Sequence, residues 1–189
     1  NMESAHYIAI EGPIGVGKTS LAERLAEVIG AVVLLEVTEE NPFLSNFYKD
    51  PDRYSFQTQL FFLLSRYRQQ LDLTQLDLFQ RSVVSDYVFA KDRIFAYENL
   101  DEDEIVLYEE VYSLLRARIP PPDLVVLLQA GTSVLMDRIE KRRRDYERHI
   151  TMTYLNKVNE AYNRYFLHYT ETSLLVVNTD SIDFVNRQA

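Results

Sequence analysis

The stretch EGPIGVGKTS, residues 11–20, decides the fold class, because it contains the pattern G-x-x-x-x-G-K-[ST] between Gly12 and Thr19. A short apolar segment, YIAI, precedes it, and a segment with helical spacing, LAERLAEVIG, follows it. A strand, a glycine-rich loop and a helix N-terminus in this order gather backbone N–H groups where polyphosphate oxygens bind. The sequence therefore predicts a phosphate-binding loop.

The side chains of this loop have chemical roles that follow from their types. Lys18 is expected to neutralise the β and γ phosphates of a nucleoside triphosphate, and the Thr19 hydroxyl to coordinate the accompanying Mg²⁺. The predicted ATP-binding residues are Gly12, Pro13, Ile14, Gly15, Val16, Gly17, Lys18, Thr19 and Ser20.

Two other protein classes have glycine-rich loops of related sequence. Gly15 and Gly17 begin the dinucleotide pattern G-x-G-x-x-G, but Ser20 stands where the third glycine belongs. A regulatory GTPase would share the loop, yet the guanine-binding motif N-K-x-D does not occur in the sequence. A small-molecule kinase fits better than either class.

Outward from the loop, short apolar runs of strand length alternate with longer segments of helical spacing. This alternation predicts an α/β domain whose five-stranded parallel sheet has helices on both faces and binds ligands at the carboxyl ends of its strands. With no repeat and no linker, residues 1–189 are expected to form a single domain. The predicted strands are residues 7–10, 31–35, 83–85, 124–128 and 174–177, and the predicted helices are residues 18–29, 54–73, 102–118, 133–143 and 151–169.

Composition narrows the classes of partner. The formal net charge of −9, from 29 acidic and 20 basic side chains, would repel a nucleic acid polymer over most of the surface. A small phosphorylated ligand needs only a local positive pocket, which the run KRRRDYER at residues 141–148 can supply. No segment has the roughly 18 apolar residues of a membrane span, and the first residues lack a secretory leader. The absence of cysteine excludes disulfides and thiolate metal sites, and we expect a cytoplasmic protein.

An acidic residue, Glu36, stands at the end of the second predicted strand in LLEVTEENPFL. The carboxyl end of that strand lies near the place to which the loop would direct a γ phosphate, so Glu36 could accept the proton of an acceptor hydroxyl. Spacing alone equally allows helix capping or exposure to solvent. Glu39 and Glu40 are expected to begin a short helix.

Four further segments resemble the deoxynucleoside kinase family, and the resemblance runs through nearly the whole chain. They are NPFLSNFYKD at residues 41–50, YSFQTQLFFLLSR at 54–66, VVSDYVFAKDRIFA at 83–96 and DRIEKRRRDYERHI at 137–150. The resemblance implies a three-layer P-loop kinase fold that transfers the γ phosphate of ATP, with Mg²⁺, to the 5′-hydroxyl of a deoxynucleoside in nucleotide salvage. It also implies a homodimer built through helices.

The resemblance assigns the acceptor site. Glu36 takes the place of the family's base, Tyr48 that of the tyrosine at the sugar 3′-hydroxyl, and Gln59 with Arg66 those of the residues that read the nucleobase. Seven residues separate Gln59 from Arg66, which is about two helical turns, so both can face one pocket. The implied substrate-binding residues are Glu36, Leu44, Tyr48, Gln59, Arg66, Asp86, Asp92 and Glu147.

The segment after the third strand departs from the family pattern, which is an acid followed by arginine and serine. Asp86 fits the acid and is implied to support Mg²⁺ together with Thr19, but Tyr87 replaces the arginine. Which cation does the work of that arginine is left open, with Lys91 as a candidate. The same departure in bacterial purine-preferring members favours deoxyadenosine or deoxyguanosine as the substrate.

The basic run resembles the family's lid, residues 138–150, whose Arg138, Arg142 and Arg144 are implied to close over the donor phosphates. Preorganised guanidinium groups stabilise the charge of a transferring phosphoryl group. Glu147 aligns with a lid acid that pairs with the tyrosine at the sugar.

Two alternatives stay open beside a deoxynucleoside kinase. A nucleoside monophosphate kinase such as a thymidylate kinase would need an extra arginine near Glu36 for the phosphate of its acceptor, and none occurs between Leu34 and Lys49. A non-enzymatic module that uses ATP as a switch would have no use for the lid arginines or for Gln59 with Arg66.

Overall fold

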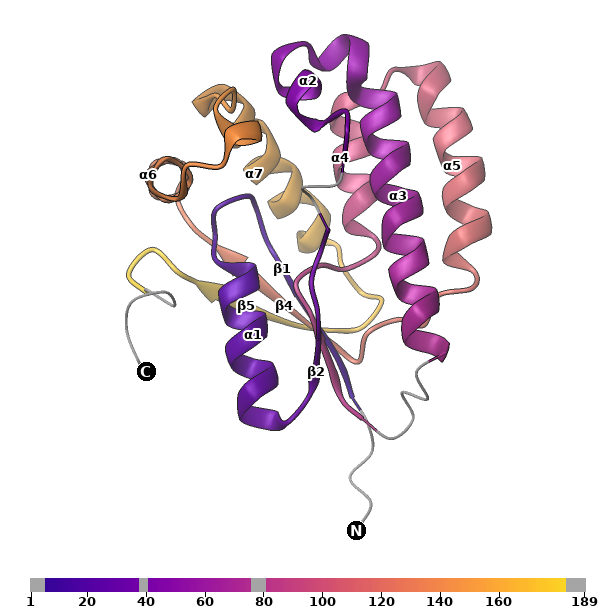
Figure 1. The fold of residues 1–189 in the computed structure, drawn as a ribbon, viewed down its shortest axis with the longest axis vertical. Helices are drawn as coiled ribbons and strands as arrows, with labels where there is room; N and C mark the ends of the chain where they lie inside the picture. The colour runs from indigo at the N-terminus through magenta and orange to yellow at the C-terminus, as the bar shows by residue number, and fades with distance from the viewer. Residues whose placement is uncertain (1–5, 38–40, 76–80, 183–189) are drawn as a thin grey trace.

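The computed structural model describes residues 6–37, 41–75 and 81–182, and it shows strands and helices in alternation (Figure 1). The strands are β1 Tyr7–Glu11, β2 Val32–Leu34, β3 Val83–Ser85, β4 Leu124–Gln129 and β5 Ser173–Asn178. The helices are α1 Lys18–Ile29, α2 Leu44–Lys49, α3 Pro51–Gln75, α4 Lys91–Asn99, α5 Glu102–Arg116, α6 Thr132–Arg142 and α7 Met152–Leu167, with a 3₁₀ turn, η2, at Asp145–Glu147.

The five strands form one parallel sheet, as predicted, and their order is β2-β3-β1-β4-β5. β1 lies at the centre, with β3 on one side and β4 on the other. The strand order reverses at β1, and the crevice at the carboxyl end of such a switch point is where open α/β sheets bind ligands. The loop that follows β1 is therefore placed at the ligand-binding edge.

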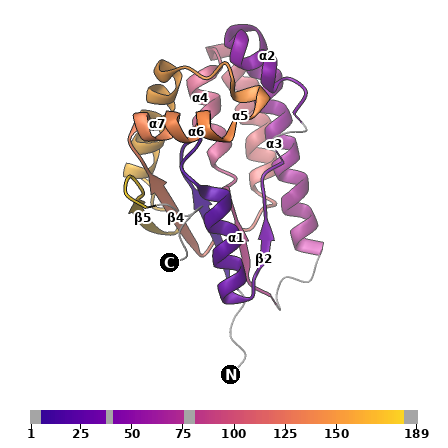
Figure 2. The same cartoon turned by 60° about the vertical axis from the view of Figure 1, so that its left-hand side comes forward.

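Alternating side chains of the central strands build two cores, one on each face of the sheet. Ile10 and Leu128 pack with residues of α1 and α6, whereas Ala9 and Leu127 pack with residues of α4 and α7. Figure 2 shows α1 and α6 together on one side of the sheet. The three-layer arrangement predicted from the sequence is confirmed.

A third core joins α4 to two outer helices, α3 and α5. Leu63 of α3, Phe89 and Ala96 around α4, and Tyr108 with Tyr112 of α5 are buried together. The rings of Phe89 and Tyr112 stack with their centroids 5.3 Å apart. Figure 1 shows these helices side by side. Helix α4 thus packs against the sheet and α7 on one side and against α3 and α5 on the other.

The structure contains two helices, α2 and α4, that sequence periodicity did not predict. The sequence of α4, KDRIFAYEN, has no polar face to alternate with an apolar one, because Lys91 and Asp92 are buried along with Ile94 and Ala96. The predicted helix 54–73 begins earlier, at Pro51, where proline is well tolerated in the first turn. The helix expected at Glu39 and Glu40 falls outside the described residues.

Within residues 6–37, 41–75 and 81–182, no helix is long and apolar enough to cross a bilayer.

Candidate active site

The loop between β1 and α1 has a backbone that only glycine accommodates easily. Gly12, Gly15 and Gly17 have φ angles of 152°, 86° and 105°. A Cβ atom on Gly12 would lie 2.5 Å from the carbonyl oxygen of Leu128. Helix α1 starts directly after this loop without a side-chain cap, so its first N–H groups remain available for an anion.

Lys18 lies across the loop. Its Nζ donates to the carbonyl oxygen of Gly12 at 2.6 Å. Burial lowers the pKa of Lys18 to about 8, and the nearby charge of Lys91 contributes to the same shift. An ammonium group with so little solvent around it gains most from a negatively charged neighbour, which is what a triphosphate would supply.

Glu11, the last residue of β1, anchors the start of the loop. Its carboxylate accepts hydrogen bonds from the backbone N–H groups of Gly12 and Val88 and from the Tyr162 hydroxyl, each at 2.9 Å. These bonds join the loop to the segment after β3 and to α7. Sequence reasoning missed Glu11; the available signal was an acid that ends an otherwise apolar strand, YIAIE.

Asp86 connects the phosphate loop to the second strand. One carboxylate oxygen accepts from the Thr19 hydroxyl at 2.6 Å, and the other accepts from the backbone N–H of Glu36 at 2.7 Å. The structure therefore brings together three residues that the sequence places far apart. A hydroxyl and a carboxylate are oxygen ligands of the kind that Mg²⁺ prefers.

The number of protein ligands that Thr19 and Asp86 provide, two, also suits Mg²⁺. In the ranges that the structure describes, no group of three or more His, Cys, Asp or Glu side chains could hold a metal by itself. Mg²⁺ typically binds one or two protein oxygens and completes its shell with substrate phosphates and water. The two residues thus suit a metal that arrives with a nucleotide.

Glu36 is buried between two cations. Arg66 contacts its Oε1 atom, and the Nζ of Lys91 lies 2.8 Å from its Oε2 atom. Burial by itself would raise the pKa of Glu36, but the charges of Arg66 and Lys91 hold that pKa well below its usual range. Glu36 is therefore ionised at neutral pH, and its two carboxylate oxygens contact cations rather than solvent.

Arg66 also contacts Asp92 through its other terminal nitrogen. Asp92 is fully buried, and the Tyr108 hydroxyl donates to its second oxygen at 2.6 Å. The guanidinium of Arg66 lies 4.8 Å from the centroid of the Phe62 ring. Gln59, two turns earlier on α3, is buried as well, so the pair predicted to read a nucleobase lies inside the protein rather than on an outer face.

Tyr87, which replaces the arginine of the family pattern, is completely buried. Its ring centroid lies 6.0 Å from the guanidinium carbon of Arg66. Burial raises the pKa of its hydroxyl, which stays neutral. Tyr87 thus supplies no charge, and the cation beside Glu36 on this segment is Lys91.

The α2 side of the site is aromatic. Tyr48 and Phe47 of α2 pack against Tyr154 of α7, with each ring centroid 5.9 Å from that of Tyr154. Leu44 is buried at the start of α2. Helix α2 also packs against η2, which contains the buried Glu147.

The predicted lid arginines have different surroundings. Arg138 donates to the carbonyl oxygen of Val16 at 3.2 Å and to that of Thr179 at 2.7 Å, so it is attached to the phosphate loop. Arg142 forms a two-point ion pair with Glu147, with its Nε atom 2.8 Å from Oε2. Arg144 is half-buried just before η2.

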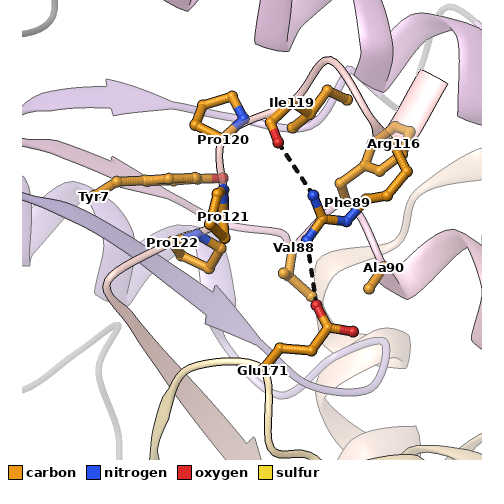
Figure 3. A pocket seen from close by; sticks show the side chains of 10 residues that line it. All are labelled: Tyr7, Val88, Phe89, Ala90, Arg116, Ile119, Pro120, Pro121, Pro122 and Glu171. Atoms are coloured by element: carbon orange, nitrogen blue, oxygen red, sulfur yellow. Dashed lines mark hydrogen bonds and ion pairs between the residues drawn. The ribbon is translucent and has the colours of Figure 1, made fainter.

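A separate hollow between the β3–α4 segment and the turn before β4 is too small for a substrate. Its volume is about 10 Å³, room for a single water at most. Arg116 crosses it, donating to the Ile119 carbonyl at 3.1 Å and approaching the Glu171 carboxylate at 3.3 Å (Figure 3).

Comparisons with known proteins point to one family. The deoxynucleoside kinase family model matches residues 8–189. A deoxyguanosine kinase of Bacillus subtilis is 37% identical, covering 97% of this chain and 91% of its own length, and a deoxyadenosine kinase of Dictyostelium discoideum is 32% identical, covering 98% and 76%. Among solved structures, the deoxyadenosine kinase from M. mycoides with bound products dCMP and dCDP has a TM-score of 0.83 and 26% identity, covering 94% of this chain and 92% of its own.

Proposed function

The chain belongs to the deoxynucleoside kinase family, and on that premise we propose that it transfers the γ phosphate of ATP to the 5′-hydroxyl of a purine deoxynucleoside in cytoplasmic nucleotide salvage. The observation that carries the proposal is the Asp86 bridge, which ties Thr19 of the phosphate loop to the backbone of Glu36. This bridge links the loop proposed to hold the triphosphate to the backbone of the residue whose carboxylate is proposed as the base. Phosphoryl transfer needs this pairing of a donor cradle with a group that manages the acceptor proton.

On the donor side, the loop N–H groups and Lys18 bind the phosphates. Arg138, already attached to the loop, and Arg142 with Arg144 add positive charge over the transferring group. Thr19 and Asp86 would hold Mg²⁺, which neutralises charge on the phosphate oxygens when bound.

On the acceptor side, Glu36 accepts the proton of the 5′-hydroxyl while that oxygen forms its bond to phosphorus. Tyr48 and Glu147 position the sugar, and Leu44 contributes apolar surface. Gln59, Arg66 and Asp92 read the base. Amide and guanidinium groups can hydrogen-bond to a purine edge, and the names of the deoxyguanosine and deoxyadenosine kinase relatives support a purine.

The test is a phosphorylation assay with Mg-ATP and each of the four deoxynucleosides, with deoxythymidine monophosphate as the competing acceptor. We expect 5′-monophosphate from deoxyadenosine or deoxyguanosine. Product from the monophosphate alone would establish the nucleotide kinase alternative. ATP binding without transfer to any acceptor would establish the switch alternative.

We also propose a homodimer through α3 and α5. These neighbouring helices expose large apolar side chains: Leu64 on α3, with 42% of its surface exposed, and Val106, Leu107 and Leu114 on α5, with 60%, 56% and 72%. Such a concentration of apolar surface is typical of a protein interface. Light scattering is expected to give the mass of a dimer for the wild type and of a monomer for the double variant Leu107→Glu, Leu114→Glu; a monomeric wild type would contradict the proposal.

A further inference from the structure

Glu36 has one cation at each carboxylate oxygen, and the two cations come from different helices. Arg66 of α3 contacts Oε1, whereas Lys91, the first residue of α4, lies 2.8 Å from Oε2. Lys91 is 5% exposed, which is unusual for a lysine and demands a charged partner. Glu36 is that partner.

The two cations differ in the number of charged partners that they contact. Arg66 divides its guanidinium between Glu36 and Asp92, and the proposed function gives it the nucleobase as a further partner. If Arg66 turns towards a nucleobase, its contact with Oε1 of Glu36 weakens. The contact between Lys91 and Oε2 of Glu36 is unaffected by this change of partner.

Lys91 is held by its own segment. Its backbone N–H donates to the carbonyl oxygen of Val88 at 3.0 Å, and Val88 is in turn bound by Glu11. The next residue, Asp92, is fixed by Tyr108. Lys91 therefore belongs to a segment that hydrogen bonds hold at Val88, before it, and at Asp92, after it.

The charge of Lys91 also acts on the phosphate loop, because it contributes to lowering the pKa of Lys18. Tyr87, buried and neutral, offers no charge in this region.

We propose that Lys91 is the positioning residue of the transfer reaction: it holds Glu36 by Oε2, so that Oε1 faces the acceptor hydroxyl when Arg66 turns to the nucleobase. The proposal rests on the proposed function. In the step it serves, the 5′-oxygen bonds to the γ phosphorus, its proton passes to Glu36 Oε1, and the bond from phosphorus to the β–γ bridging oxygen breaks. Lys91 keeps its own proton throughout.

The experiment compares Lys91→Met, Lys91→Gln and Lys91→Arg with the wild type, and uses Lys157→Met, on the exposed side of α7, as a matched control. Lys91→Met and Lys91→Gln are expected to lower kcat about tenfold to a hundredfold, the range for a lost hydrogen bond between charged groups, with the acceptor KM nearly unchanged. Lys91→Arg should restore part of the rate. Lys157→Met should behave as the wild type. Circular dichroism checks that each variant is folded, and if Lys91→Met fails to fold, Lys91→Gln and Lys91→Arg carry the comparison.

A double-mutant cycle with Glu36→Gln separates action through Glu36 from action on the phosphates. If Lys91 acts through Glu36, replacing it in the Glu36→Gln background costs almost nothing further in kcat. An equal cost in both backgrounds, or wild-type turnover of the folded Lys91→Gln variant, overturns the inference. Failure of the wild-type enzyme to phosphorylate any deoxynucleoside would instead overturn the proposed function on which it rests.

Discussion

The proposed donor and acceptor sides of the site differ in the chemical groups that form them. The phosphate loop of the proposed donor side is made largely of backbone: three glycines with positive φ and the first N–H groups of α1, with Lys18 as its one charged side chain. The acceptor side is made of buried charged side chains, Glu36, Arg66, Lys91 and Asp92, which neutralise one another. Backbone dipoles stay in place as long as the loop does, whereas each buried charge depends on its partners.

This difference predicts how mutations on each side affect the reaction rate and the stability of the protein. A single change on the donor side removes charge stabilisation directly, because the loop offers no second ammonium of its own. On the acceptor side, a change also leaves the remaining partners with an unbalanced buried charge. Mutations should therefore affect rate alone on one side, and rate together with stability on the other.

The largest effect is expected for Lys18→Met. The variant removes the ammonium that we propose faces the β and γ phosphates, and kcat should fall on the order of a thousandfold, the upper range for one preorganised electrostatic group. The melting temperature should change little, because burial already disfavours the charged form of Lys18. Steady-state kinetics and thermal unfolding check both expectations. A marked loss of stability would contradict the contrast between the two sides.

A smaller effect is expected for Glu36→Gln. The amide keeps the shape of the side chain but cannot take a proton, so turnover should fall roughly a hundredfold or more while the acceptor still binds. The variant also leaves Arg66 and Lys91 with less negative charge between them, so it should unfold at a lower temperature than the control Glu23→Gln, which is exposed on α1. Titration calorimetry with deoxyadenosine or deoxyguanosine measures the binding. Near-normal turnover would remove Glu36 from the role of base.

The smallest effect is a pH dependence of ATP binding. Burial, followed by the charge of Lys91, lowers the pKa of Lys18 in the free protein from 10.5 to about 8. The ammonium is therefore lost as the pH rises through about 8, and ATP affinity should be about tenfold weaker at pH 9 than at pH 7. Calorimetry in buffers of different ionisation enthalpy should also show proton uptake on binding near pH 8. Equal affinities at the two pH values would mean that Lys18 does not change its charge in this range.

The same contrast explains how much the sequence could predict. The loop and the five strands depend on local signals, a glycine pattern and short apolar runs, and all of them are found in the structure. Helix α4 escaped prediction because Lys91 and Asp92 are buried by contacts with Glu36, Arg66 and Tyr108, which are distant in sequence. From the sequence alone, the polar residues of such a helix are expected to face solvent, because their buried partners are not known.

The roles given to Gln59, Arg66, Asp92 and Glu147 came from resemblance to a family, since spacing could place only the first two on one side of a helix. Glu11 was missed altogether, because its three donors come from the loop, from Val88 and from α7. Pairings of this kind are set by how the elements pack, and no local pattern carries them.

The contacts of Arg138 attach α6, where the predicted lid begins, to the rest of the protein. Because this side chain fastens α6 to the carbonyls of Val16 and Thr179, the helix has to stay with the body of the protein. The helix ends at Arg142, and the next residue, Arg143, has the left-handed backbone conformation with a φ of 51°. If the predicted lid closes over a nucleotide, we expect the segment that begins at Arg143 to move while α6, with Arg138 and Arg142, stays in place.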